Sequence, residues 1–350
     1  VTMGGGHFHS HLPEYSLKNF PELDFIVRFE GEETLRELLE TLRSGGDLSK
    51  VASIAYRQDG QIITTSPRPL IKDLDSLPLP DYGLMPIEKY SPFGNLWPKA
   101  ITIQGSRGCK YVCNFCSWTA TEGAHKLIDG KLTMVPVFRQ KSVAKVMEEI
   151  DILYNKYKIR YLFWVEGTWN HDHQWINDLC EEIIRRGYKL GWWAFVRADL
   201  LLEQEKLGIL EKMVKAGFRH TLFGGERPVS EELKMIGKDD MPPDALKEVC
   251  HLLERKYPQV FRQATFTTGI RAETRETMER LGQYSRDSHL DFAAFHPLEP
   301  WPGTPLWDEA NKKGWIETYD FSVYDMFYPV MPSEHLSREE ISILSQKLYK

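Results

Sequence analysis

Apolar residues between positions 100 and 296 follow two alternating patterns. Short apolar runs typical of buried strands are separated by longer segments in which apolar side chains recur about every 3.6 residues, the period of an amphipathic helix. Strands are predicted at residues 100–104, 161–166, 191–196, 220–224, 263–269 and 291–296, and helices at 142–157, 173–187, 204–216, 243–256 and 274–288. Strands that alternate with helices predict right-handed βαβ units and a parallel sheet.

This repeat suits two α/β architectures. Six strands fit an incompletely closed six-stranded (β/α) barrel best, and an open doubly wound sheet is the structural alternative. In both architectures, ligands gather at the carboxyl ends of the strands. We therefore expect the functional residues in the loops that follow the predicted strands.

The first 65 residues predict a separate small α/β unit. Its expected elements are a strand at 24–28, a helix that begins near Gly31 and ends at Gly45-Gly46, and a hairpin of strands 52–56 and 61–65 around Asp59-Gly60. An Asp-Gly pair between two apolar runs is a strong hairpin signal. Residues 66–98 are rich in proline and lack periodicity, so they predict a connector.

Composition and charge exclude several classes of protein. The 350 residues are 42% hydrophobic, 27% charged and 12% aromatic, which is typical of a globular protein and not of a disordered chain. Lys and Arg total 44 against 50 Asp and Glu, without a basic stripe, so nucleic acid is a poor candidate partner. No apolar run predicts a membrane span. The start of the sequence has no signal-peptide pattern, so a cytoplasmic location is expected.

Three of the five cysteines lie within eight residues, directly after the first predicted barrel strand. Cys109, Cys113 and Cys116 can hold one soft metal centre, and a [4Fe-4S] cluster bound by only three thiolates would keep one iron open for a ligand. The competing interpretation is a zinc site completed by a histidine such as His125. Cys180 and Cys250 lie on apolar faces of predicted helices and are interpreted as small buried hydrophobes.

Cys109-x3-Cys113-x2-Cys116, with Phe115 before the third cysteine, resembles the signature of radical S-adenosylmethionine (SAM) enzymes. Further segments in matching order resemble the subgroup with a cobalamin (B12)-binding domain, which includes methyltransferases of unactivated carbon and the anaerobic magnesium-protoporphyrin monomethyl ester cyclase. These segments are 4–7, 27–34, 67–78, 222–226, 269–274 and 300–306. The resemblance implies a truncated α/β cobalamin-binding-like domain (1–65), a connector (66–98), a radical SAM (β/α)6 barrel (99–300) and a C-terminal extension (301–350), in a chain that begins inside the cobalamin domain.

The resemblance also implies roles for individual residues. Cys109, Cys113 and Cys116 would bind the [4Fe-4S] cluster. Five residues at or just beyond the ends of predicted barrel strands would bind SAM: Glu166 its amino group, Arg197 its carboxylate and Glu226 its ribose, with the backbone of Gly224 and Gly225 close to the ligand. Gly4, Gly5 and Gly6 would line the nucleotide tail of cobalamin. The loop at 269–274 departs from the subgroup because Arg271 stands where a proline is usual.

The function implied is reductive cleavage of SAM to methionine and a 5′-deoxyadenosyl radical, which starts chemistry on an unactivated C–H bond. Methyl transfer and cyclase-like oxidation of a tetrapyrrole both remain open. The alternative is a zinc-stabilised or degenerate barrel that acts as a binding module. Ordinary core packing explains most of the tryptophans in or just beyond the first three barrel strands, and those that face the barrel mouth would favour a flat or apolar small molecule. Flavodoxin or ferredoxin would supply the electron. His7, His9 and His11 are expected on a solvated turn and not at a metal.

Overall fold

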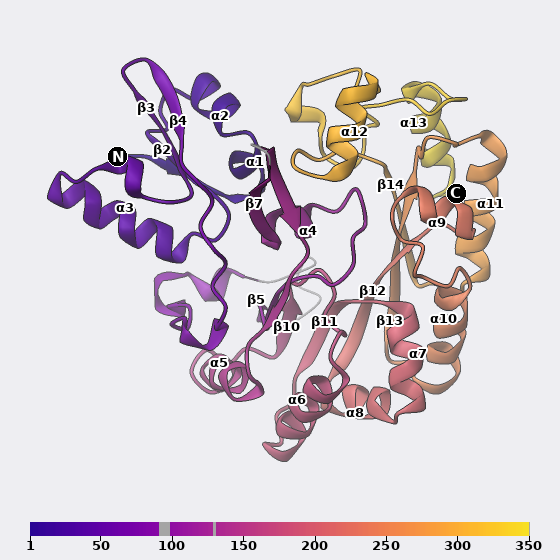
Figure 1. Ribbon diagram of the computed structural model, residues 1–350. Coiled ribbons are helices and arrows are strands. Elements are labelled where there is room, and N and C mark those ends of the chain that lie inside the picture. Colours follow the sequence, from indigo (N-terminus) through magenta and orange to yellow (C-terminus); the bar gives the residue numbers. More distant parts are fainter. Residues whose placement is uncertain (91–98, 129–130, 350) are drawn as a thin grey trace. The chain divides into compact units, whose positions relative to one another are not determined.

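A computed structural model describes residues 1–90, 99–128 and 131–349 (Figure 1). The chain divides into two compact units. The N-terminal unit comprises residues 1–72, 107–139 and 300–312, and the barrel unit comprises residues 73–106, 140–299 and 313–350. The segment with the three cysteines therefore belongs to the N-terminal unit, although it lies between two barrel strands in the sequence. None of the helices in the described ranges has the length and apolar character that crossing a bilayer requires.

The barrel unit is built on one six-stranded sheet. Its strands are β5 (Ala100–Ile103), β10 (Tyr161–Trp164), β11 (Gly191–Val196), β12 (Phe218–Glu226), β13 (Phe261–Thr268) and β14 (Phe292–Pro297). They follow this order across the sheet, and all neighbouring pairs are parallel. A doubly wound sheet reverses its strand order at a switch point, whereas right-handed crossovers in one direction place every helix on the same face. The sequential order confirms the partial (β/α)6 barrel, a sheet whose edge strands are β5 and β14.

Except at 230–235 and 338–347, where none was predicted, the helices of the barrel unit, drawn in Figure 1, lie close to their predicted positions. They are α5 (Val143–Asn155), α6 (His173–Arg185), α7 (Ala198–Lys206), α8 (Ile209–Ala216), α9 (Ser230–Met235), α10 (Ala245–Lys256), α11 (Arg275–Asp287) and α13 (Arg338–Lys347), with 3-10 turns at Leu74–Ser76, Tyr82–Leu84, Ile87–Lys89 and Phe321–Val323. The single helix predicted at 204–216 is wrong. Gly208 has φ of 71°, a left-handed conformation that ends α7 and begins α8.

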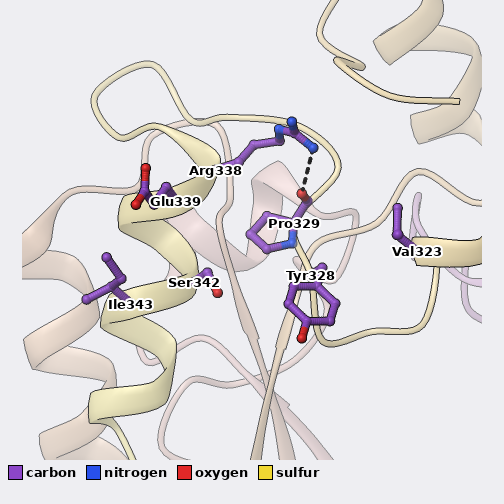
Figure 2. Close-up of a pocket in the computed structure, with 7 residues that line it drawn as sticks. All are labelled: Val323, Tyr328, Pro329, Arg338, Glu339, Ser342 and Ile343. Carbon is purple, nitrogen blue, oxygen red and sulfur yellow. Dashed lines mark hydrogen bonds between the residues drawn. The ribbon is translucent and has the colours of Figure 1, made fainter. Parts of the chain in front are cut away.

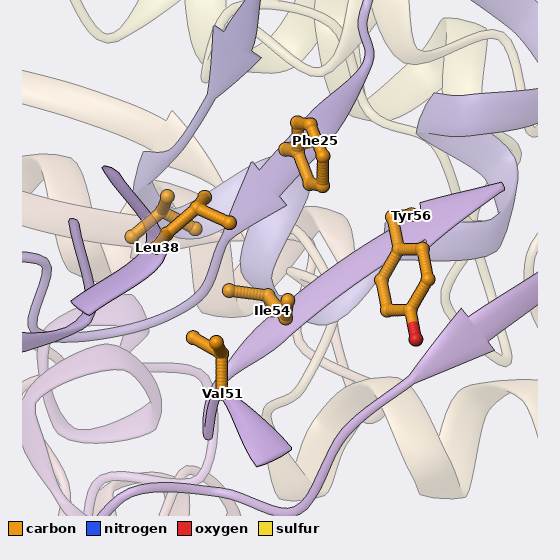
Figure 3. Packing of buried hydrophobic residues seen from close by; sticks show 6 residues of the cluster. Phe25, Leu38, Val51, Ile54 and Tyr56 are labelled. Atoms are coloured by element: carbon orange, nitrogen blue, oxygen red, sulfur yellow. The ribbon is translucent and has the colours of Figure 1, made fainter. Parts of the chain in front are cut away.

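The N-terminal unit contains a four-stranded sheet with helices. Its elements are β1 (Met3–Gly4), β2 (Phe25–Val27), β3 (Ile54–Gln58), β4 (Gln61–Thr64), α1 (Gly6–His11), α2 (Pro13–Asn19), α3 (Glu32–Ser44) and a 3-10 turn at Leu48–Lys50. Strands β3 and β4 form the predicted hairpin, with positive φ at Asp59 and Gly60. The core packs Phe25, Ile54 and Tyr56 against Leu38 of α3 (Figure 3).

Sequence patterns did not predict the elements between residues 105 and 141. These are β6 (Ser106–Gly108), α4 (Ser117–Glu122), β7 (Ala124–Ile128), β8 (Lys131–Val135) and β9 (Phe138–Gln140), and α12 (Pro305–Lys313) follows later in the chain. Strands β7 and β8 form a hairpin, and β6 pairs with β9. Two side chains tie this segment to the rest of the N-terminal unit, because Arg107 and Arg139 both donate to Glu30 Oε1, at 2.8 Å and 2.7 Å.

Candidate functional site

The cysteine loop runs from the end of β6 to the start of α4. Cys109 directly follows β6 and is 7% exposed. Cys116 is the N-cap of α4, and its backbone N–H donates to the carbonyl of Cys113 at 3.2 Å, which closes a tight turn between these two cysteines. The three sulfur donors therefore lie on one short loop that is fixed at both ends by secondary structure.

The thiol of Cys116 is buried and accepts backbone hydrogen bonds. Burial raises its pKa and the nearby Cys109 raises it further, while hydrogen bonds from the backbone N–H groups of Trp118 and Thr119 lower it. Hydrogen bonds that favour the charged sulfur are what a cluster ligand needs, because the thiolate is the form that binds iron. In the described ranges, however, no three His, Cys, Asp or Glu side chains are grouped closely enough to hold a metal ion. The donors fit an iron-sulfur cluster by their chemistry, and binding it requires the loop to bring the sulfurs together.

Gly108 fixes where the cysteine loop begins. Its φ is 81°, and a Cβ built on it would lie 1.8 Å from the carbonyl oxygen of Val137. Its N–H donates to Glu122 Oε2 at 2.6 Å. Only glycine allows the two backbone segments to approach this closely.

We expect Gly108→Ala to displace the cysteine loop. Backbone strain alone costs about 1 to 3 kcal/mol, and the clash with Val137 adds to it, so the melting temperature should fall and less iron should bind after reconstitution. Differential scanning fluorimetry and iron analysis measure both effects. Gly187→Ala is the matched control, because Gly187 also has positive φ, 69°, but has no atom within 4 Å of a built Cβ. Equal losses in both variants would contradict the role given to Val137.

His125 is already used in the N-terminal unit. Its Nε2 lies 2.7 Å from the carbonyl oxygen of Ala120, and its ring stacks on Phe29 with a centroid distance of 3.6 Å. Burial lowers its pKa to about 4, so the ring is neutral at pH 7. The structure therefore gives no support to a zinc ion completed by His125.

The N-terminal histidines lie on a packed helix, so the expectation of a solvated turn is wrong. His7 and His11 are on α1, one turn apart, with ring centroids separated by 4.8 Å. His7 Nδ1 contacts Thr121 Oγ1 at 2.5 Å, and the ring of His11 lies 5.7 Å from that of His125. Burial lowers the pKa of His7 to about 4. Burial also lowers the pKa of His11, to about 2, and the neighbouring His7, His125 and Arg28 contribute because they disfavour a positive charge on His11.

The glycines predicted to line cobalamin lie at the end of β1. A Cβ on Gly4 would lie 3.2 Å from both His9 and Ile26, and one on Gly5 would lie 3.3 Å from the Val27 carbonyl oxygen. Gly6 has φ of 85° with open space around a built Cβ. Close packing on β2 accounts for the first two glycines, and cobalamin contact by all three stays a prediction.

In the barrel unit, Glu166 follows β10 and is 2% exposed. Its carboxylate accepts hydrogen bonds from the backbone N–H groups of Gly105 and Ser106, and Ser106 Oγ donates to Oε2 at 3.1 Å. These two residues start the segment that leaves β5 toward the cysteines. Glu166 thus anchors that segment, and its predicted bond to the SAM amino group stays a prediction.

Arg197 directly follows β11 and is 6% exposed. Its guanidinium binds Asp199 in a bidentate arrangement, with Nε to Oδ1 at 3.0 Å and Nη2 to Oδ2 at 2.8 Å, and Nη1 lies 3.4 Å from Asp240. This is the fork geometry that suits a carboxylate. A ligand carboxylate would have to displace Asp199 or Asp240 to bind this guanidinium.

Glu226, Gly224 and Gly225 lie at the carboxyl end of β12. Lys238, which sequence patterns did not single out, donates to the Gly224 carbonyl at 2.6 Å and to Glu226 Oε1 at 3.2 Å, and Thr267 donates to Oε2 at 2.7 Å. A Cβ on Gly225 would lie 2.7 Å from Leu246, so tight packing explains this glycine. Lys238 thus bridges the backbone carbonyl of Gly224 and the carboxylate of Glu226.

The next residue along the chain, Arg227, is fully buried in an ion network. Its guanidinium donates to both carboxylate oxygens of Glu273, at 2.8 Å and 2.9 Å, and to Glu232 at 2.8 Å. Glu273 also accepts the N–H of Gly269 at 3.0 Å. These bonds tie the loops after β12 and β13 together, which holds the carboxyl ends of both strands in place.

Strands β10 and β11 contain three tryptophans, Trp164, Trp192 and Trp193. Of these three, Trp193 lies on the face of the sheet away from the helices. Trp164 packs on Trp175 of α6 at 6.3 Å, whereas Trp193, on the opposite face, packs on Phe163 at 5.5 Å and Phe195 at 4.5 Å. Trp164, Trp169 and Trp192 are at most 1% exposed, so core packing explains them. An aromatic surface therefore lies on the inner face around Trp193.

Two further features of the barrel unit lie after β14. Glu299 is 3% exposed, and its pKa is raised to about 8 by burial and, to a smaller extent, by the charge of Asp325. A cavity of 380 Å³ is lined by residues that include Val323, Tyr328, Arg338 and Ile343 (Figure 2). None of the SAM-binding residues predicted from the sequence lines this cavity.

Comparison with known proteins identifies relatives along the whole chain. An uncharacterised methyltransferase of Pyrococcus horikoshii is 30% identical over 354 aligned residues, which cover 100% of this chain and 71% of that protein. The anaerobic magnesium-protoporphyrin IX monomethyl ester cyclase of Rubrivivax gelatinosus is 30% identical over 97% of this chain, which spans 58% of the cyclase. No family model matches the sequence.

A solved structure supports the fold. The radical SAM methyltransferase TsrM from Kitasatospora setae, solved with cobalamin and a [4Fe-4S] cluster, superposes with a TM-score of 0.66 at 17% identity, over 98% of this chain and 64% of TsrM. At this identity the match shows a shared fold alone.

Proposed function

Because the chain belongs to the cobalamin-binding subgroup of radical SAM enzymes, we propose that it binds a [4Fe-4S] cluster and cleaves SAM reductively to start radical chemistry. The observation that carries the proposal is the triplet of Cys109, Cys113 and Cys116 on one short loop, with backbone N–H groups directed at Cys116. When bound, such a cluster supplies one electron to the sulfonium of SAM.

The cysteines would bind the cluster, and residues at the carboxyl ends of the barrel strands would bind SAM. Cys109, Cys113 and Cys116 would hold three irons and leave the fourth for SAM. Arg197 would bind the SAM carboxylate in exchange for one of its aspartates, and Glu226 would accept hydrogen bonds from the ribose. Glu166 would keep the segment after β5 in place and contact the amino group, while Gly224 and Gly225 would keep the strand end free of side chains.

We propose that the radical acts on an unactivated C–H bond of a flat or apolar small molecule. The aromatic surface around Trp193 supports this substrate class, because flat rings stack on aromatic side chains. Methyl transfer and cyclase-like oxidation are both supported, since the relatives include a methyltransferase and a cyclase. Cobalamin near Gly4, Gly5 and Gly6, a flavodoxin or ferredoxin as electron donor and a cytoplasmic location complete the proposal.

The test is anaerobic reconstitution with iron and sulfide, followed by addition of SAM and dithionite. We expect about four irons and four sulfides per chain and formation of 5′-deoxyadenosine, measured by liquid chromatography. Stoichiometric zinc, without SAM cleavage, would support the zinc-stabilised binding module and contradict the proposal. Protein incubated without dithionite is the control for spontaneous SAM breakdown.

A second assay separates the two reaction types. The reconstituted protein is incubated with hydroxocobalamin, desalted and examined for the corrinoid absorbance. Dithionite and SAM labelled in its methyl group are then added, because the cobalt must be reduced to Co(I) before it can accept a methyl group and cleavage of SAM to methionine also consumes an electron. Label recovered on cobalamin indicates methyl transfer. Retained cobalamin with all label left in methionine indicates cyclase-like chemistry. Protein that retains no cobalamin would contradict the assignment of Gly4, Gly5 and Gly6.

A further inference from the structure

Glu226 ends β12 in a conformation that costs free energy. It has φ of 41°, in the left-handed region that side chains other than glycine rarely adopt, and the pairing of β12 with β13 shifts register between Gly224 and Glu226. Strained backbone of this kind costs about 1 to 3 kcal/mol and persists where surrounding contacts impose it, often at functional sites. Here Lys238 and Thr267 both donate to the carboxylate of this residue.

Lys238 is buried beside this carboxylate. The lysine side chain is 8% exposed and that of Glu226 is 11% exposed, so the ion pair is largely shielded from water. Truncating one member of such a pair leaves the other charge without a partner, so the two side chains act as a unit. Thr267 Oγ1 donates to the second carboxylate oxygen and so fixes the plane of the carboxylate.

Gly224 is required by the same arrangement. A Cβ built on Gly224 would lie 2.5 Å from Lys238 Nζ and 2.6 Å from Glu226 Oε1. The ammonium and the carboxylate thus occupy the space in which any side chain at position 224 would stand. A strained glutamate, a buried lysine and a glycine that makes room for both form one built arrangement at the carboxyl edge of the barrel.

We propose that Lys238 is a positioning residue for SAM: it holds the Glu226 carboxylate so that its remaining lone pairs accept the ribose hydroxyls. A carboxylate has about four acceptor sites, and the lysine and Thr267 use two of them, which leaves two for a pair of neighbouring hydroxyls. The inference rests on the proposed function, because it names a further residue of the SAM site.

The test measures affinity and not turnover. Isothermal titration calorimetry is carried out on anaerobic, cluster-loaded protein without reductant, with SAM and with its 2′,3′-dideoxy analogue as ligands. Lys238→Met should weaken SAM binding about tenfold to a hundredfold, because hydrogen bonds that involve a charged group are the strong ones. Binding of the dideoxy analogue should not change, because it lacks the hydroxyls. Lys238→Arg should retain most of the affinity for SAM.

Two further variants keep the test decisive. Lys234→Met removes a lysine from the exposed side of α9 and should leave the affinities for both ligands unchanged. Thr267→Val removes the other donor to the carboxylate and should weaken SAM but not the analogue, which tests the site even where Lys238→Met fails to fold. Equal weakening of both ligands, or of neither, would overturn the role of Lys238 while SAM binding by the wild type stands. A wild type that binds no SAM would overturn the proposed function as well.

Discussion

Replacing any one of Cys109, Cys113 and Cys116 with serine is expected to abolish 5′-deoxyadenosine formation and most cluster binding. Each thiolate would hold one iron, and a neutral hydroxyl is a poor ligand for iron in such a cluster. The turn between Cys113 and Cys116 and the backbone N–H groups directed at Cys116 would remain, so the expected loss is specific to the sulfur. Iron and sulfide analysis, together with the visible absorbance of the reconstituted protein, measures it.

The chain provides matched controls in its other two cysteines. Cys180 and Cys250 are 0% exposed, on α6 and α10, and burial raises the pKa of both thiols, that of Cys250 to about 12. Protonated, inaccessible thiols do not bind iron. Cys180→Ser and Cys250→Ser should therefore keep the full iron content. Retention of the cluster by a variant of the triplet, or its loss in these controls, would contradict the assignment.

The strands of the barrel unit could be predicted because strands of a parallel sheet are largely buried and therefore form short apolar runs in the sequence. Apolar runs such as Tyr161–Trp164 are covered on one face by helices, so their pattern does not depend on distant contacts. Helix ends were predictable where the terminating chemistry is local, as at Gly45, whose left-handed backbone with φ of 67° ends α3. The break at Gly208 escaped prediction because the apolar positions of α7 and α8 continue across it.

The segment around the cysteines was not predictable in the same way. Its elements are three to six residues long, too short to show a period, and the N-terminal unit holds them through contacts far apart in the sequence. Arg107 and Arg139 reach Glu30 across 77 and 109 residues. The spacing of the cysteines indicated the chemistry of the segment but not its structure.

Among the site residues, too, some could be predicted from local sequence and others depend on contacts between distant segments. Glu166, Arg197 and Glu226 could be proposed because each lies at, or within two residues of, the end of a predicted strand, at a position that the family resemblance assigns to SAM. Their partners could not be, because Lys238 and Thr267 are placed by α9, the loop after it and β13, whose contacts with Glu226 exist only in the folded sheet. Sequence position thus predicted which charges lie at the barrel edge, and the structure shows which of them are paired.

Glu299→Gln is expected to stabilise the protein at neutral and alkaline pH. Glu299 Oε1 accepts the N–H of Met326 at 2.7 Å, while Oε2 is buried without a hydrogen-bond partner in the described part of the chain. Burial and Asp325 raise its pKa from 4.5 to about 8. Tyr324 interacts with the charge of Glu299, and His296 Nδ1 lies 3.1 Å from the Met326 carbonyl oxygen.

The sign follows from proton linkage. The folded state keeps the proton to a higher pH than the unfolded state does, so the stability that this carboxyl contributes is fully present below about pH 4.5 and is lost as the pH rises toward 8. Glutamine keeps the bond from Met326 and carries no charge, so the variant should gain about 3 kcal/mol over the wild type at pH 7, somewhat more at pH 8, and nothing at pH 4.5. Urea denaturation followed by tryptophan fluorescence at these three pH values measures the free energy of unfolding. Glu279→Gln, at an exposed position on α11, should show no such pH dependence. A variant of Glu299 less stable than the wild type at pH 8 would mean that the carboxylate is charged and bonded in the folded protein.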